Sequence, residues 1–206
     1  YRAHVVEALD RKALVTAGPT FEAIDPVRFI GNHSSGKIGF AIADTLARLG
    51  ADVTLIDGPT SQKNAQQLNR IDVTSAAEML DACLQHFDSA KVCVMSAAVA
   101  EYTPVTVAGK KIKKQDAGLN IDLKKTADIL KTLGERKKAG QFLIGFALET
   151  DDEEANAIKK LQSKNLDLIV LNSLNDTGAG FKTDTNKITI IDRRLQKTAF
   201  GLKSKD

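Results

Sequence analysis

Glycines, serines and a lysine gather in a short segment between a predicted strand and a predicted helix. The segment reads NHSSGKIG over residues 32–39, and Gly18 follows the apolar residues 13–17. Glycine lets a ligand approach the backbone closely, and serine hydroxyls and the amides that open a helix donate to phosphate oxygens. The pattern therefore predicts an anion site within residues 18–39. The residues expected to bind the anion are Gly18, Ser34, Ser35 and Gly36.

The spacing of these glycines matches neither of two common nucleotide-binding fingerprints. Lys37 is followed by Ile38 instead of serine or threonine, which departs from the P-loop, and G-x-G-x-x-G is absent. Turns and close packing would explain the glycines as well as a ligand would. The spacing alone leaves both interpretations open.

A second group of residues follows the apolar residues 91–95. Small residues occupy positions 96–100 (SAAVA), Glu101 comes next, and lysines fill four of the five positions 110–114. Small residues after a strand leave room for a flat ligand, whose phosphates the lysines could bind. The alternative for the lysines is a solvated charged surface.

A third group combines the end of a strand with a charged helix. Phe146 ends an apolar run, Asp128 begins a predicted helix, and Lys160 and Lys164 are four residues apart. Residues with that spacing share one face of a helix and can reach the same anion. A solvated helix surface is again the alternative.

The composition is that of an ordinary globular protein. The chain has 206 residues, of which 43% are hydrophobic and 27% charged, so we expect one domain over residues 12–206, preceded by a linker or short helix over residues 1–11. A net charge of +3 and a pI near 8.8 suit anionic substrates and are too weak to indicate nucleic acid.

Two cysteines, Cys83 and Cys93, lie in apolar sequence, which predicts buried thiols and a cytoplasmic setting. We expect no membrane span, no secretory signal and no protein metal site.

Strand-like and helix-like segments alternate along the chain. This order predicts an α/β fold: one Rossmann-like domain with a doubly wound, mostly parallel sheet and helices on both faces. Ligands of such sheets bind at the carboxyl ends of the strands. The helices are expected at residues 40–49, 75–87 and 128–138, with a fourth opening at 151–154. The strands are expected at residues 13–17, 52–56, 70–73, 91–95, 142–146, 166–171 and 187–191.

The segment DPVRFIGNHSSGKIG (residues 25–39) resembles the opening motif of the phosphopantothenoylcysteine synthetases, which are usually the second half of a bifunctional decarboxylase/synthetase of coenzyme A biosynthesis. SAAVA, KIKK (residues 111–114) and GFALET (residues 145–150) are similar to later motifs of that family. The similarity covers about residues 12–192.

The resemblance implies an enzyme that ligates 4'-phosphopantothenate with L-cysteine. Bacterial bifunctional members use CTP and Mg²⁺, form an acyl-cytidylate and release pyrophosphate and then CMP. A homodimer is implied, together with a flavin-dependent decarboxylase that is either fused or a separate chain. Other branches use ATP.

The resemblance also implies roles for individual residues. Asn32 and Lys111 match catalytic positions, and Arg28 and Asn32 match positions that bind substrate. The chain departs from the family at Glu101 and Ala127, where aspartate and proline are common. The positions that match nucleotide contacts are Ala97, Glu101, Lys111, Ala127, Asp128, Ile129, Leu130, Phe146, Lys160 and Lys164.

Three points stay open from sequence. His33 is either a proton shuttle or a structural residue, and Arg28 could form a simple surface ion pair. A nicotinamide-dependent reductase is a second candidate function, although it should carry the missing glycine fingerprint. A non-catalytic nucleotide-binding module is a third.

Overall fold

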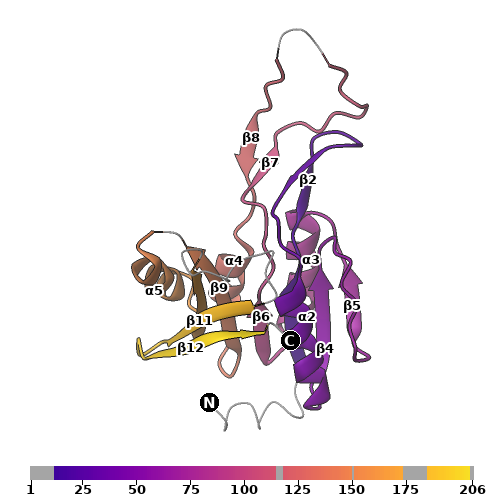
Figure 1. Cartoon of the computed structure of the whole chain (residues 1–206). Coiled ribbons are helices and arrows are strands. Elements are labelled where there is room, and N and C mark those ends of the chain that lie inside the picture. The colour runs from indigo at the N-terminus through magenta and orange to yellow at the C-terminus, as the bar shows by residue number, and fades with distance from the viewer. Residues whose placement is uncertain (1–11, 115–117, 150, 174–184, 205–206) are drawn as a thin grey trace.

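The computed structural model describes residues 12–114, 118–149, 151–173 and 185–204, and the chain forms one large sheet with helices around it (Figure 1). The strands of this sheet are β1 (Lys12–Ala17), β4 (Asp52–Asp57), β5 (Asn69–Asp72), β6 (Val92–Met95), β9 (Phe142–Glu149), β10 (Leu168–Ser173), β11 (Thr185–Asp192) and β12 (Lys197–Ser204). Their order is β12-β11-β10-β9-β6-β1-β4-β5. Strand pairs are parallel from β10 to β5, whereas β11 is antiparallel to both of its neighbours. The prediction of a mostly parallel α/β sheet is confirmed.

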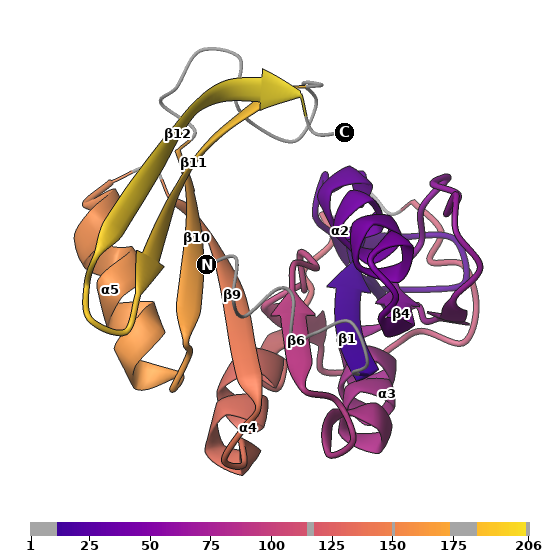
Figure 2. The same cartoon turned by 90° about the horizontal axis from the view of Figure 1, so that it is seen from below.

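Helices cover both faces of the sheet, as predicted. They are α2 (Lys37–Arg48), α3 (Ala76–Phe87), α4 (Ile129–Arg136) and α5 (Glu153–Ser163). Phe40 and Ala43 of α2 pack with Val15 in one apolar core. Met79 of α3, Leu133 of α4 and Leu161 of α5 belong to the core of the opposite face. Figure 2 shows α2 on one side of the strands and α3 and α4 on the other.

Local capping explains where the helices begin. The hydroxyl of Ser75 accepts a hydrogen bond from the backbone amide of Glu78, and the side-chain carboxylate of Glu78 accepts one from the backbone amide of Ser75. Helix α3 therefore opens with the predicted capping box. Asp128 caps α4 by accepting from the Lys131 amide at 3.0 Å. Helix α2 begins earlier than predicted because Gly36, at φ +80°, ends the preceding turn in a left-handed conformation.

An arm that the sequence did not predict projects from the sheet beyond β6. It contains two short antiparallel pairs, formed by β2 (Phe21–Ala23) with β3 (Phe29–Gly31) and β7 (Tyr102–Pro104) with β8 (Leu123–Lys125). Figure 1 shows β7 and β8 reaching away from the helices. Strands of three residues carry almost no periodic signal, which is why sequence analysis assigned none here. The bounds of β12 were likewise not predicted from the sequence.

The two cysteines are free and buried, as predicted. Burial raises the pKa of both thiols to about 12, so they are neutral. No helix within residues 12–114, 118–149, 151–173 and 185–204 has the length and apolar character needed to cross a bilayer. Residues 1–11, the expected linker or short helix, lie outside the described residues.

Candidate functional site

A cavity of about 660 Å³ opens at the carboxyl ends of the parallel strands. Thr16 of β1, Met95 of β6 and Phe146 of β9 line it, together with the start of α2. Strand β1 pairs with β4 on one side and β6 on the other, so the chain order reverses beside the cavity. Ligands of open α/β sheets bind at such a switch point, and the volume is typical of small-molecule sites.

The turn before α2 is held against this cavity by contacts from distant residues. The hydroxyl of Thr60 donates to the carbonyl oxygen of Ser35 at 2.8 Å. A Cβ atom at Gly39 would lie 2.5 Å from the Cβ of Ala17, so only glycine lets α2 approach β1 this closely. Residues 36–39 line the cavity, so α2 begins at its edge, where the first amides of a helix can bind an anion.

The segment after β6 forms the cavity wall and is fixed by side chains from other strands. Ser96 donates through its hydroxyl to the Thr16 carbonyl at 2.6 Å, and the Ala97 amide donates to the Thr16 hydroxyl at 3.2 Å. The Nδ2 group of Asn32 donates to the carbonyl oxygens of Ala98 and Val99 at 3.0 and 3.2 Å. The first and second predicted groups are therefore joined directly by hydrogen bonds.

The lysines of α5 reach the cavity from the other end. Lys160 donates to the carbonyl oxygen of Phe146 at 2.8 Å. Burial, and then the neighbouring charge of Lys164, lower the pKa of Lys160 below its usual value. An anion beside Lys160 would relieve both effects, because a negative charge favours the ammonium form.

Lys164 lies on the same face and pairs with Asp128 at 2.8 Å. Burial alone would raise the pKa of the Asp128 carboxyl, but hydrogen bonds from Lys164 and the Lys131 amide outweigh it and hold the pKa below its usual value. Asp128 is therefore an ionised carboxylate that keeps Lys164 at the cavity.

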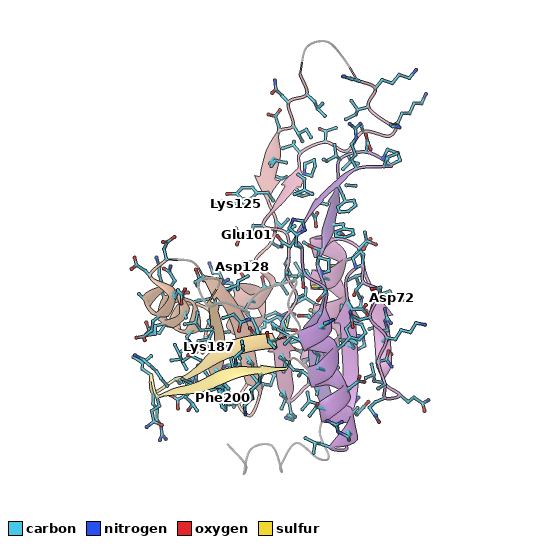
Figure 3. All side chains as sticks on the ribbon, viewed as in Figure 1. Asp72, Glu101, Lys125, Asp128, Lys187 and Phe200 are labelled. Atoms are coloured by element: carbon cyan, nitrogen blue, oxygen red, sulfur yellow. The ribbon has the colours of Figure 1, made fainter. Side chains whose placement is uncertain are left out.

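Charge is unevenly distributed around the cavity. Among the described residues, four lysines line it (Lys37, Lys125, Lys160 and Lys164) against two carboxylates, Glu101 and Asp128. Figure 3 shows Lys125, Glu101 and Asp128 close to one another between the base of the arm and the sheet. The excess of positive charge favours a ligand with several negative charges.

Most residues that the sequence singled out come together here. Those that line the cavity are Asn32, Ser34, Ser35, Gly36, Ala97, Glu101, Ala127, Asp128, Ile129, Leu130, Phe146, Lys160 and Lys164. They come from segments up to 132 residues apart in the chain, between Asn32 and Lys164. Their convergence matches the ligand crevice expected at the strand ends.

Four singled-out residues lie elsewhere. Gly18, at φ +75°, packs against the backbone of Gly58 behind the turn. His33 is exposed and does not line the cavity. Arg28 pairs with Asp25, and Lys111 lies exposed on the arm, so neither lines the cavity formed within one chain.

Some lining residues were missed. Lys125 is the last residue of β8 and Thr126 follows it, and the Thr126 hydroxyl donates to the Ala100 carbonyl at 2.7 Å. Asn172 of β10 and Asn186 of β11 line the far end, with Asn186 donating to Asn172 at 3.3 Å. Polar residues at the ends of apolar strands were the available signal for this pair, whereas Lys125 belongs to a strand too short to predict.

A family described as the DNA/pantothenate metabolism flavoprotein C-terminal domain matches residues 8–206. The chain belongs to this family. A solved structure of the C-terminal domain of Coenzyme A biosynthesis bifunctional protein CoaBC is 42% identical to this chain. The two superpose with a TM-score of 0.81, and the match covers 96% of this chain and 90% of that one. The expected resemblance to the synthetase half of a bifunctional coenzyme A protein is confirmed.

Two curated relatives extend the comparison. The Coenzyme A biosynthesis bifunctional protein CoaBC of Bacillus subtilis (strain 168) is 50% identical over 196 residues, which are 95% of this chain and 48% of that protein. A protein named Cysteine/Cysteine sulfinic acid decarboxylase, from an unknown prokaryotic organism, is 53% identical over 196 residues, which are 95% and 55% of the two chains. This chain thus spans about half the length of the curated relatives it matches.

Proposed function

We propose that this domain ligates 4'-phosphopantothenate with L-cysteine, using CTP and passing through an acyl-cytidylate, as a step of coenzyme A biosynthesis. One observation carries the proposal: the turn at residues 32–36, the wall at residues 96–101 and the lysines of α5 meet around one positively charged cavity. These are the segments that resemble the synthetase motifs. The chain also matches relatives named for coenzyme A biosynthesis over nearly its whole length.

The first step needs charge compensation more than a base. The carboxylate of 4'-phosphopantothenate is ionised at neutral pH and attacks the α-phosphorus of CTP, and pyrophosphate leaves with the bond electrons. Lys160 and Lys164 would hold the phosphates against mutual repulsion. Mg²⁺ would neutralise part of the triphosphate charge. The described residues contain no group of three or more His, Cys, Asp or Glu side chains that could hold a metal, so the phosphate oxygens and water would be its main ligands.

In the second step the amine of L-cysteine attacks the acyl carbon, and CMP leaves with the electrons of the broken acyl–oxygen bond. Asn32 has two possible roles in this step: donating to the acyl oxygen or orienting the intermediate. Its Nδ2 group already donates to two backbone carbonyl oxygens. We therefore assign Asn32 the orienting role, with its Oδ1 atom as the acceptor.

We further propose that the active form is a homodimer in which the arm of one protomer supplies Lys111 to the cavity of its partner. Lys111 does not line the cavity of its own chain. Large apolar side chains are exposed on the arm, at about half of their possible area, as a docking surface would require. They are Val27 (58%), Phe29 (51%), Val105 (53%), Val107 (52%), Leu119 (52%) and Leu123 (45%).

The alternative functions are less well supported. The acid that would bind a nicotinamide ribose, Asp57, is buried and paired with Arg70 at 2.9 Å, and the glycine fingerprint is missing. Decarboxylation, the reaction named for one relative, does not need a site for several phosphates. A cytoplasmic enzyme fits the two reduced thiols, and a flavin-dependent decarboxylase, fused or separate, is the proposed partner.

The deciding experiment measures pyrophosphate release with 4'-phosphopantothenate and Mg²⁺, comparing CTP with ATP and reactions with and without L-cysteine. We expect CTP-dependent turnover that requires cysteine, and a stalled acyl-cytidylate in Asn32→Ala. Asn69→Ala is the matched control, because Asn69 pairs with Thr54 at 3.3 Å on β4 and β5 and does not line the cavity. Turnover with ATP alone would overturn the nucleotide assignment. Nucleotide binding without turnover, in a dimeric sample, would favour the binding module.

A further inference from the structure

We propose that Asp25 and Arg28 are positioning residues that hold the backbone next to Lys111. This inference rests on the proposed function, because it assumes that Lys111 acts on the nucleotide. The family resemblance implied that Arg28 binds substrate, which stays a prediction. Within the chain, Arg28 contacts Asp25 and Ile112.

Both backbone groups of Ile112, the residue after Lys111, are bound by this pair. The Ile112 amide donates to Oδ2 of Asp25 at 3.0 Å, and the Ile112 carbonyl accepts from the Arg28 guanidinium at 2.7 Å. These contacts join residues 84 and 87 positions apart. We call this arrangement of Asp25, Arg28 and Ile112 the clasp.

The clasp is itself firmly built. The side chain of Asp25 has no exposed area, and its Oδ1 atom accepts from the amides of Val27 and Arg28 at 2.8 and 2.9 Å. Arg28 pairs with the remaining oxygen through two nitrogens, one of them at 3.0 Å. The hydrogen bonds from Arg28 hold the pKa of the Asp25 carboxyl well below its usual range, so it is ionised at neutral pH.

A second contact supports the same segment of the arm. The Ala108 amide donates to the Ile24 carbonyl at 3.0 Å, beside Asp25. Residues 108–112 are therefore attached at both ends to the turn between β2 and β3. Lys111 lies inside this attached stretch and is itself exposed, so its backbone is fixed while its side chain stays accessible to a ligand.

Fixing the backbone of a catalytic lysine lowers the entropy lost when the transition state forms. Misplacement of a reacting group by about 1 Å can cost about a hundredfold in rate. Loss of the clasp should therefore slow the step that uses Lys111, and should leave ground-state binding of CTP in the cavity nearly unchanged.

The first test follows the arm directly and needs no activity. A fluorophore is attached through Lys111→Cys, which is selective because Cys83 and Cys93 are buried with thiol pKa values near 12. We expect the anisotropy of the label to fall in the Asp25→Asn background. The matched control is Asp88→Asn, since Asp88 also forms an ion pair at 2.8 Å, with Lys138, and lies outside the arm. Equal anisotropy of the label in the otherwise wild-type, Asp25→Asn and Asp88→Asn backgrounds would overturn the clasp.

The second test separates rate from binding. With CTP and 4'-phosphopantothenate but no cysteine, Asp25→Asn should slow acyl-cytidylate formation by about ten- to a hundredfold, with the KM for CTP changed by less than about twofold. Arg28→Lys, which keeps the charge but loses the guanidinium fork, should fall between wild type and Asp25→Asn. A change in KM alone would refute positioning.

Arg28→Gln is the second variant in case Asp25→Asn unfolds, because Arg28 is partly exposed. Arg28→Gln should lower both the anisotropy of the label and the rate of acyl-cytidylate formation, as Asp25→Asn does. If Arg28→Gln changed neither quantity, the clasp would be refuted. If the wild type itself forms no acyl-cytidylate, the proposed function fails, and the anisotropy still decides whether the clasp orders the arm.

Discussion

Replacement of Gly39 by alanine would test whether the close approach of α2 to β1 builds the anion site. The new Cβ would lie 2.5 Å from the Cβ of Ala17 and 2.7 Å from the hydroxyl of Ser96. Carbon atoms in contact normally lie about 3.5 to 4.0 Å apart. Ala17 is fully buried in the central strand, so α2 would have to shift by about 1 Å.

Two effects on stability oppose each other in Gly39→Ala. Overpacking of a close-packed core costs about 1 to 3 kcal/mol, whereas alanine is favoured over glycine inside a helix by about 1 kcal/mol. The net loss in the free energy of unfolding should be about 0 to 2 kcal/mol. The same shift moves the first amides of α2 away from the phosphates, and a displacement of about 1 Å can lower the rate by about a hundredfold.

The assay combines urea unfolding with pyrophosphate release at varied CTP. Gly201→Ala is the matched control, because a Cβ there meets no atom within 4 Å and Gly201 lies on β12. Activity should fall much more than stability in Gly39→Ala and neither should change in the control. A variant of Gly39 with normal stability and normal activity would refute the packing argument.

Three further predictions concern titratable groups. Lys160→Met should weaken CTP binding by about tenfold or more. Because burial lowers the pKa of Lys160, the affinity of the wild type for CTP should begin to fall at a lower pH than if an ordinary lysine bound the nucleotide. Calorimetry at several pH values should show that the affinity of the variant depends less on pH. The Asp25 carboxyl has a lowered pKa in the fold through its bonds from Arg28, so its stabilising effect is complete above its unfolded pKa of about 3.9 and is lost as the pH falls through the folded value. Urea unfolding should therefore show that the difference in the free energy of unfolding between wild type and Asp25→Asn becomes smaller as the pH is lowered. A difference that grows on acidification would contradict this prediction. Cys83 and Cys93 should react with a thiol reagent only after unfolding, because burial raises their pKa to about 12, and rapid labelling of native protein would contradict this.

The sheet and its helices were predictable because their signals are local. Apolar runs such as residues 13–17 and 52–56 are long enough to identify buried strands, and Ser75 with Glu78 forms a helix start that needs no distant partner. The arm was not predictable. Its strands have three residues each, and the hydrogen bonds that join the two pairs connect residues 84 and 87 positions apart.

Most residues of the site could be singled out from the sequence, since most of those named at positions 32–36, 96–101 and 160–164 line the cavity. What the sequence could not give was the role of each side chain. Arg28 was expected at the substrate, but it does not line the cavity of its own chain, and its contacts with Asp25 and Ile112 depend on how the arm folds back.

The sequence by itself determined the class of fold, the order of its elements and many of the residue types that line the cavity. These depend on periodicity and on short motifs, whose physics acts within a few residues. Only the tertiary structure decided that Lys160 and Lys164 share a cavity with Asn32, and that Lys111 does not lie there in the same chain. Such placements depend on contacts between segments about a hundred residues apart, which no local pattern records.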